Sequence, residues 1–233
     1  MRVGFIGASG TGKSTLVRLL QAAHPDVPVN PVGSRSVAKA MGFVHPAGSP
    51  QVGEGNPYAV DHASESIYLG SLAISNDPLI AAHTARFVAP DASRSPLAPH
   101  QLKTCRPLFQ VRLQAEKITW EAEHDAFLTD RTPLDDLAYA ILHCREVVDD
   151  AFLDRVFAAM SRYDVVFYCP LATFCNLDGD ASRVAERAYH RIHDAILAGL
   201  IEQHERPDGS LVQALRDPSL VARQEIVSWF VHS

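Results

Sequence analysis

Short apolar runs alternate along this chain with longer segments whose apolar positions recur at helical spacing. The runs predict buried strands over residues 2–7, 126–130, 164–169 and 210–215, and a weaker strand over the proline-containing residues 26–32. The longer segments predict helices over residues 14–24, 34–43, 59–75, 108–124, 149–163, 183–205 and 218–232, with another helix beginning at 133. Strands that alternate with helices are typical of an α/β fold, in which helices cover both faces of a parallel sheet.

Composition sets further limits. The chain has 233 residues, 47% of them hydrophobic, which is enough to bury the core of a single domain over 1–233. No apolar run approaches the roughly 18 uncharged residues of a membrane span, and the N-terminus is too rich in glycine for a secretory signal. The four cysteines, at 105, 144, 169 and 175, lack the spacing of a zinc or redox motif. These features predict a cytoplasmic protein with free thiols and no membrane partner.

Charge is distributed unevenly along the chain. The formal net charge is −6, yet between residues 79 and 115 the only acidic side chain is Asp91. The same segment holds the cations Arg86, Arg94, Lys103, Arg106 and Arg112. A basic segment in an acidic protein either faces a polyanion or forms a solvated loop that balances acidic neighbours. Both interpretations stay open.

The glycine-rich stretch behind the first predicted strand carries the most specific chemical signal. Residues 7–14 match the complete G-x-x-x-x-G-K-S pattern of a P-loop, with a strand before it and a helix after it. Glycines let the backbone curl so that N–H groups surround a phosphate, and Lys13 would contact the β- and γ-phosphates. The Ser14 hydroxyl is a natural Mg²⁺ ligand. The pattern predicts that a nucleoside triphosphate is bound by Gly7, Ser9, Gly10, Thr11, Gly12, Lys13, Ser14 and Thr15.

Asp130 and Arg131 stand at the end of a predicted strand, and a helix follows at once with Thr132 as its N-cap and Pro133 in its first turn. In a P-loop sheet, ligands bind at the carboxyl ends of the strands. If this strand neighbours the first, Asp130 reaches Mg²⁺, and Arg131 contacts the acceptor or the transferring phosphoryl group. The alternative is a surface Asp-Arg pair that only begins a helix.

The Asp-Arg pair followed by "TPLDDLAYA" resembles the Asp-Arg or Glu-Arg signature of nucleoside and nucleotide kinases of the thymidylate-kinase-like group. The similarity is greatest to the branch with nicotinamide-riboside kinase domains and bacteriophage P-loop kinases, whose helix is matched by Asp135, Ala138 and Tyr139. The resemblance covers about 1–42 and 108–205. It implies a three-layer P-loop NTPase fold with a parallel sheet ordered 2-3-1-4-5, and it implies ATP and Mg²⁺ as cofactors.

The stretch "NLDGDASRVAERAYHRIHDAI" resembles the lid of these kinases, placed here at about 173–192. Arg183, Arg187 and Arg191 recur every four residues, so they share one helix face. The resemblance implies that Arg183 and Arg187 close over the triphosphate and neutralise charge in the transition state. The alternative is a solvated stripe paired with Glu186 and Asp194.

The chain departs from the group in two places. A segment at about 45–107, inserted and substrate-facing in our interpretation, has no counterpart that aligns. The acidic residue that commonly follows the second strand as general base is also absent, because Gly33 and Ser34 stand there. Arg35, beside them, either contacts the substrate or lies on a surface helix.

The missing base leaves three alternatives open. An acceptor that is already a phosphate needs no general base, whereas a hydroxyl acceptor benefits from a carboxylate that takes its proton. In the second case Asp130 acts as the base, or folding brings in Asp61 or Glu65.

Together these features predict a kinase that moves the γ-phosphate of ATP to a nucleoside- or nucleotide-type acceptor. The favoured acceptor is 5-hydroxymethyluracil within DNA, as in bacteriophage kinases that the chain resembles, and the protein would then lie in the host cytoplasm. Arg106 and the basic segment would contact the DNA backbone. Gln110 and Gln114, one turn apart, either hydrogen-bond a nucleobase edge or face solvent. The alternative acceptors are a free deoxynucleotide, a nucleoside or nicotinamide riboside.

A rival function from another class is a P-loop ATPase that couples hydrolysis to conformational change. The chain contains no N-K-x-D motif, which disfavours GTP as the nucleotide. The sequence leaves the oligomeric state open, a dimer included.

Overall fold

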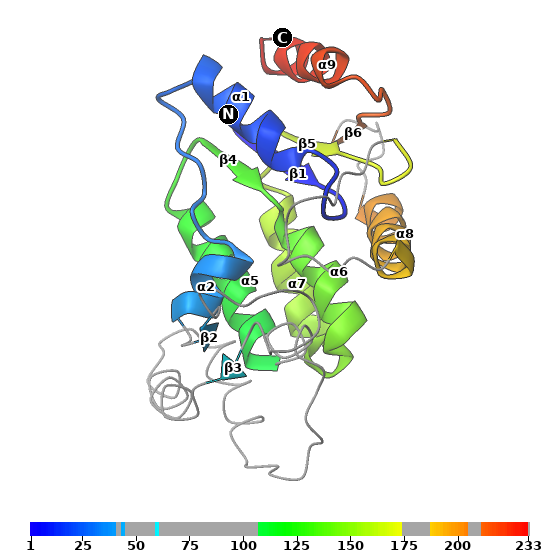
Figure 1. Cartoon of the computed structure of the whole chain (residues 1–233). Coiled ribbons are helices and arrows are strands. Elements are labelled where there is room, and N and C mark those ends of the chain that lie inside the picture. Colours follow the sequence, from blue (N-terminus) through cyan, green and yellow to red (C-terminus); the bar gives the residue numbers. More distant parts are fainter. Residues whose placement is uncertain (41–42, 45–58, 61–106, 174–186, 205–210, 233) are drawn as a thin grey trace.

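A computed structural model describes residues 1–40, 43–44, 59–60, 107–173, 187–204 and 211–232 (Figure 1). Four strands form one sheet in the order β4-β1-β5-β6, and each pairs in parallel with its neighbours. They are β1 (Arg2–Ile6), β4 (Phe127–Asp130), β5 (Val165–Tyr168) and β6 (Val212–Ala214). The α/β class and the parallel sheet predicted from the sequence are confirmed.

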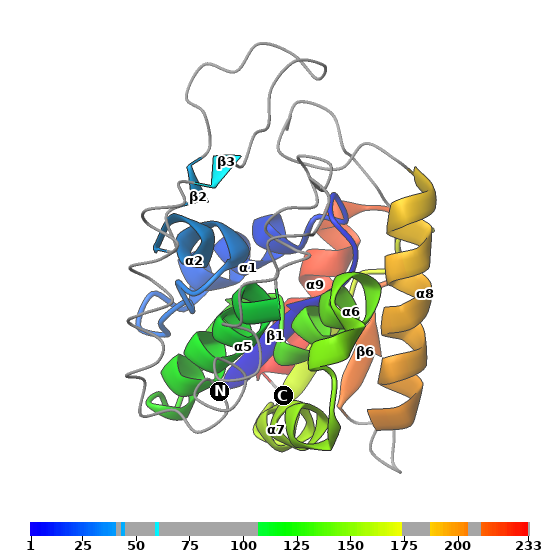
Figure 2. The same ribbon diagram turned by 90° about the horizontal axis from the view of Figure 1, so that it is seen from below.

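Helices cover both faces of the sheet, because apolar side chains alternate along each buried strand. Val3 and Phe5 pack toward α1 (Lys13–Ala23) and α9 (Leu220–His232), which lie on one face. Ile6 packs into the larger core on the other face. That core is formed with α5 (Pro107–Ala122), α6 (Pro133–His143), α7 (Asp150–Met160) and α8 (Arg187–His204) (Figures 1 and 2). The result is three layers.

Of the predicted order 2-3-1-4-5, the sheet has the last four strands in the predicted sequence, whereas residues 26–32 form only an isolated bridge. Val29 pairs with Leu128 of β4, through a bond from the Leu128 N–H to the Pro28 carbonyl (2.9 Å) and one from the Asn30 N–H to the Leu128 carbonyl (2.8 Å). Pro28 and Pro31 lack the N–H groups that a longer ladder needs. The segment therefore lies at the predicted edge of the sheet without becoming a strand.

Two predicted helices are wrong at their ends. α2 covers Ser34–Ala40, and Phe43–Val44 form the strand β2 rather than the end of that helix. β2 pairs antiparallel with β3 (Ala59–Val60), where a helix over 59–75 was predicted. Phe and Val favour such pairing. The rest of the predicted helix at 59–75 lies outside the described residues, as do 61–106 and the lid residues 174–186.

The start of α6 confirms the predicted cap. The Thr132 hydroxyl accepts the N–H of Leu134, and the Asp135 carboxylate accepts the N–H of Thr132, which together make a capping box. A short 3₁₀ helix, Arg145–Val147, follows α6. Of the described cysteines, Cys144 and Cys169 are buried, and neither forms a disulfide. No helix in the described parts of the chain is long and apolar enough to cross a membrane.

Candidate functional site

The glycine-rich loop connects the carboxyl end of β1 to α1 and needs its glycines for conformational reasons. Gly7, Gly10 and Gly12 have φ angles of 143°, 83° and 88°, in the region that side chains disfavour. A Cβ on Gly7 would lie 2.4 Å from the carbonyl oxygen of Cys169, at the end of β5. The loop is thus tightly curled against the neighbouring strand.

The first turn of α1 differs from those of α6 and α7. Gly12 is its N-cap, no side chain caps it, and no acidic residue lies in its first turn. By contrast, Thr132 caps α6 and Asp149 caps α7, and both helices carry acidic side chains in the first turn. The positive end of the α1 dipole therefore keeps its affinity for an external anion.

Lys13 lies inside the curl of the loop. Its side chain is only 4% exposed, and its Nζ donates a hydrogen bond to the Ala8 carbonyl at 2.7 Å. The Thr11 hydroxyl oxygen is 3.4 Å from the same nitrogen. Burial lowers the pKa of Lys13, and Arg131 acts in the same direction, whereas the carboxylates of Asp130 and Asp135 raise it. The predicted phosphate ligand thus shares one small region with the predicted Asp-Arg pair.

Asp130 faces the glycine-rich loop because β4 pairs directly with β1. Phe5 and Asp130 are register partners, and the Ser14 hydroxyl donates a hydrogen bond to Asp130 Oδ2. The other oxygen, Oδ1, is buried and has no hydrogen-bond partner in the structure. A hydroxyl beside a carboxylate with a free oxygen suits a hard cation such as Mg²⁺. Among the described residues, no group of three or more His, Cys, Asp or Glu side chains could hold a metal by itself.

Arg131 turns sharply out of β4 and connects the loop to α6. Its φ is 90°, unusual for a residue with a side chain, and its N–H donates to the Phe5 carbonyl at 2.9 Å. Nη2 donates to the Ser9 hydroxyl at 3.0 Å, and Nη1 donates to the Tyr139 hydroxyl at 3.1 Å. Burial lowers the pKa of Arg131, but Tyr139, Asp135 and Asp130 outweigh burial, so the net shift is upward. The guanidinium is a permanent cation beside the loop.

Asp135 ties these parts together from the first turn of α6. It is fully buried, Oδ1 accepts the Gly7 N–H at 3.2 Å, and Oδ2 accepts the Thr132 N–H at 2.9 Å. Arg131 Nη1 lies 3.7 Å from Oδ1. Burial raises the pKa of Asp135, while Arg131 and Lys13 lower it. In the sequence, Asp135 is only a position that matches the kinase signature, because its contact with the loop depends on the fold.

We call this group the site cluster. Its members, each placed by a contact given above, are Ser9, Lys13, Ser14, Asp130, Arg131, Asp135 and Tyr139.

A second buried polar group, the support cluster, lies between α5 and the sheet. It consists of Asn30, Lys117, Glu121, Asp136 and Tyr163. Lys117 Nζ lies 2.6 Å from Asp136 Oδ2, with both side chains at most 2% exposed. Asn30 Nδ2 donates to Glu121 Oε1 at 3.0 Å, and Tyr163 hydrogen-bonds the same carboxyl group. Burial raises the pKa of Glu121 to about 7, against the opposing effect of Lys117. The sequence did not single out these residues.

Gln114 lies on the same face of α5 as Lys117, one turn nearer the N-terminus of the helix. It is fully buried, and neither its amide nitrogen nor its amide oxygen has a hydrogen-bond partner in the structure. Trp120 packs on Phe127 at the start of β4, and Gln114 lies about 9 Å from Trp120 along the helix. The chain reverses direction between α5 and β4. Moving along α5 from Trp120 to Gln114 therefore leads toward Asp130, at the carboxyl end of β4. Gln110 is buried too, so solvent exposure of the two glutamines is excluded.

α8 reaches the site cluster through His193. This side chain is fully buried, its ring centroid is 4.1 Å from that of Tyr139, and neither ring nitrogen has a hydrogen-bond partner among the described residues. Burial lowers the pKa of His193 well below its usual value, and Arg131 and Lys13 act in the same direction. Helical spacing alone gave no sign of a contact with Tyr139.

Several predicted site residues are not brought to the site by the described structure. Arg183 and Arg106 lie outside the described residues. Arg35 lies in α2 and Arg187 begins α8, but their side chains lie outside what is described. Arg191 is exposed. The roles assigned to these arginines stay predictions.

The second-strand position holds no carboxylate, as the sequence predicted. Gly33 precedes α2 and Ser34 begins it. Asp61 and Glu65 lie outside the described residues.

Neither the models of protein families nor the curated proteins that were compared with this chain match it. The geometry of the site is therefore the basis for inferring what the protein does.

Proposed function

We propose that this protein is an ATP-dependent kinase with a P-loop NTPase fold. The observation that carries the proposal is the meeting of two distant motifs. Asp130 accepts a hydrogen bond from Ser14, and Arg131 donates one to Ser9, so the strand-end pair lies directly on the glycine-rich loop. An Asp-Arg pair that only begins a helix would have no reason to contact that loop on both of its residues.

The donor would bind where the loop enters α1. Uncapped amides at a helix N-terminus, with no acidic side chain in the first turn, favour phosphate oxygens. Lys13 would exchange its bond to the Ala8 carbonyl for the β- and γ-phosphates. Thr11 and Thr15 complete the loop and the first helical turn.

Ser14 and Asp130 would hold Mg²⁺. The free Oδ1 of Asp130 and the Ser14 hydroxyl supply oxygen ligands, and triphosphate oxygens commonly supply others. When bound, the ion neutralises charge on the β- and γ-phosphates.

Arg131 would act on the transferring group. A bond forms between an acceptor oxygen and the γ-phosphorus while the bond from that phosphorus to the β,γ-bridging oxygen breaks, giving ADP and a phosphorylated acceptor. Asp135 and Tyr139 hold the guanidinium in place during this step. The lid roles of Arg183 and Arg187 extend the same charge neutralisation.

The acceptor we favour is 5-hydroxymethyluracil in DNA, with a free nucleotide, a nucleoside or nicotinamide riboside as the alternative. The buried amide of Gln114 supports a base-bearing acceptor, because an amide can pair with the donor and acceptor groups of a nucleobase edge. A base inside a duplex would have to leave the stack to reach it. For a hydroxyl acceptor, Asp130 would have to take the proton in place of its role at Mg²⁺.

The test incubates the protein with γ-labelled ATP and three acceptors: free nucleosides, free mononucleotides and DNA that contains hydroxymethyluracil. Label in the DNA supports the favoured acceptor, and label in the small molecules alone removes DNA from the proposal. Lys13→Ala should abolish transfer, whereas Arg145→Ala, at an exposed position in the 3₁₀ helix, should leave it unchanged.

Phosphate released only to water would replace the kinase with an ATPase. Binding of ATP without any turnover would indicate a regulator. Absence of ATP binding by the wild-type protein would exclude all three functions: kinase, ATPase and ATP-binding regulator.

A further inference from the structure

Arg223 is a buried cation on the C-terminal helix α9, on the opposite face of the sheet from α5 and α6. It is 2% exposed and has the largest side chain among the fully buried residues of the described chain. Its Nη1 donates a hydrogen bond to the backbone carbonyl of Thr11 at 3.0 Å. Burying a guanidinium is costly unless it makes hydrogen bonds, so this contact with the glycine-rich loop offsets part of the cost of burying Arg223.

The guanidinium also lies along the backbone where the loop becomes a helix. A Cβ on Gly12 would be 3.4 Å from Arg223 Nη1 and 3.5 Å from Nη2. Gly12 has a φ of 88° and is the N-cap of α1. Arg223 is therefore packed against the peptide that orients the first amides of α1.

Thr11 connects Arg223 to the catalytic lysine. While its carbonyl accepts from Arg223, its hydroxyl donates to the Ala8 carbonyl at 2.9 Å. Lys13 Nζ donates to the same Ala8 carbonyl at 2.7 Å. The guanidinium and the ammonium thus both bind carbonyl groups of the same short turn of backbone.

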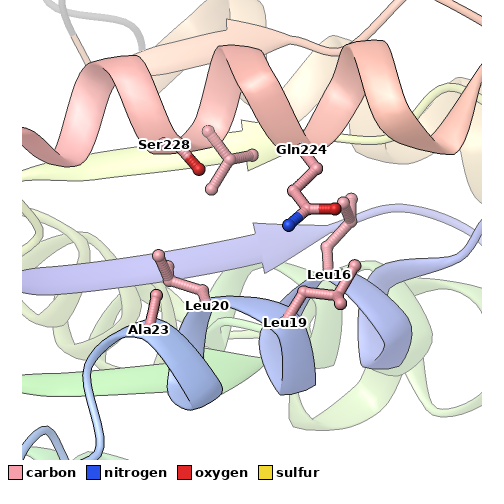
Figure 3. Close-up of a pocket in the computed structure, with 7 residues that line it drawn as sticks. Leu16, Leu19, Leu20, Ala23, Gln224 and Ser228 are labelled. Atoms are coloured by element: carbon pink, nitrogen blue, oxygen red, sulfur yellow. The ribbon is translucent and has the colours of Figure 1, made fainter.

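The remaining contact between α9 and α1 is looser. Figure 3 shows side chains of the two helices facing each other across a small cavity, which is lined by Leu16, Leu19, Leu20, Ala23, Gln224, Val227 and Ser228. Apolar packing is non-directional, whereas a hydrogen bond depends on the direction between donor and acceptor. Arg223 therefore supplies a directed contact between α9 and the loop.

We infer that Arg223 is a positioning residue for the nucleotide site, and that α9 belongs to this site although it contributes no residue to the motifs. By holding the Thr11 carbonyl, Arg223 keeps Gly12 and Lys13 oriented toward the phosphates. The inference rests on the proposed function, since the loop position affects binding only if the loop binds a nucleotide. Coupling is reciprocal, so a bound nucleotide should in turn hold α9 in place.

The test compares Arg223→Ala, Arg223→Lys and the wild-type protein, with Glu225→Ala as a matched control at an exposed position of the same helix. Titration calorimetry measures binding of ATP in the presence of Mg²⁺, and thermal unfolding is measured in parallel. Loss of a hydrogen bond from a charged donor predicts about tenfold weaker ATP binding for Arg223→Ala. Arg223→Lys should recover part of the affinity, and Glu225→Ala should match wild type.

Hydrogen exchange without nucleotide supplies a second measurement that does not depend on the proposed function. Amides of residues 11–15 should exchange faster in Arg223→Ala than in wild type, with exchange in β1 and β5 unchanged. If wild type binds no ATP, the proposed function fails, and this exchange comparison still decides whether Arg223 holds the loop.

An unchanged Kd for ATP in folded Arg223→Ala would overturn the inference, even if the melting temperature fell, because the role would then be structural alone. Should Arg223→Ala not fold, Arg223→Lys carries the test. A Lys variant with wild-type affinity and wild-type loop exchange would show that the guanidinium geometry does not position the loop.

Discussion

Asp135 and Asp136 are consecutive, equally buried and in the same helical turn, yet they belong to different parts of the molecule. Asp135 accepts hydrogen bonds from backbone N–H groups of the glycine-rich loop and of Thr132, and it lies beside Arg131. Asp136 pairs with Lys117 of α5. The side chains of successive helical residues point about 100° apart, so one serves the site cluster and the other the support cluster.

The comparison shows that a buried charge has different consequences depending on its partner. Burial raises the pKa of both carboxyl groups, and nearby cations oppose that shift in both. Asp135 accepts hydrogen bonds from the N–H groups of Gly7 and Thr132, whereas Asp136 forms an ion pair with Lys117 of the support cluster. We therefore expect the first to control activity and the second to control stability.

The largest expected effect follows removal of Asp136. Asp136→Ala leaves Lys117 in the core without its ion-pair partner, which should lower the free energy of unfolding by about 3–5 kcal/mol. Urea unfolding at pH 7 measures this. The double variant Lys117→Met, Asp136→Leu should regain most of the loss, because it removes both charges. A loss below about 1 kcal/mol for the single variant would contradict a buried pair.

Glu121 gives the support cluster a specific pH dependence. Its pKa is raised to about 7 in the folded state from an ordinary value of 4.5, so the folded state retains a proton that the unfolded state releases. The stability supplied by this group is fully present below about pH 4.5 and is lost as the pH rises toward 7. The shift corresponds to about 3 kcal/mol.

Glu121→Gln is neutral at every pH and should lack this dependence. Relative to wild type, its unfolding free energy should rise by about 3 kcal/mol between pH 4.5 and pH 8. Parallel denaturant curves for the two proteins across this range give the difference directly. If the difference in unfolding free energy between the two proteins did not change between pH 4.5 and pH 8, Glu121 would be ionised in the folded protein over this range.

Asp135→Asn tests the site cluster. It keeps a side chain of the same shape but removes the charge beside Arg131 and one of the two acceptors for the Gly7 and Thr132 N–H groups. We expect kcat/KM for phosphoryl transfer to fall about 30-fold, equivalent to roughly 2 kcal/mol. Asp136→Asn is the matched control, one residue away. Equal losses of kcat in the two folded variants would remove the distinction between the clusters.

The smallest effect is expected at Gln114, on the face of α5 that carries Lys117. Gln114→Leu removes a buried amide without partners, so the unfolding free energy should rise by about 1 kcal/mol. If Gln114 contacts the acceptor, the same variant should raise the KM for the acceptor and leave that for ATP unchanged. A higher stability with both KM values unchanged would make Gln114 a member of the core only.

Local sequence signals predicted much of the fold and the centre of the site. Short apolar runs predicted β1, β4 and β5, and the Thr132-Pro133 cap predicted the start of α6. The G-x-x-x-x-G-K-S pattern predicted a loop between a strand and a helix, and the structure has this loop between β1 and α1, which begins at Lys13. These signals are local because they arise from backbone geometry and from the periodicity of burial over a few residues.

Other features could not be predicted because they depend on which segments become neighbours. The prolines at 28 and 31 weakened the second strand in the sequence, but only pairing with Leu128 showed that a single bridge survives. The short β2–β3 pair was missed because each strand has two residues, too few for any periodicity.

By itself, the sequence determined the order of the main strands and helices, the positive-φ glycines of the loop and the carboxylate–guanidinium pair that ends β4. Only the tertiary structure decided that this pair contacts Ser9 and Ser14, that Asp135 and Asp136 serve different clusters, and that Arg223 reaches the loop from the far end of the chain. Backbone preference acts between neighbours in the sequence, whereas the energy of a buried charge depends on partners that folding supplies from a distance.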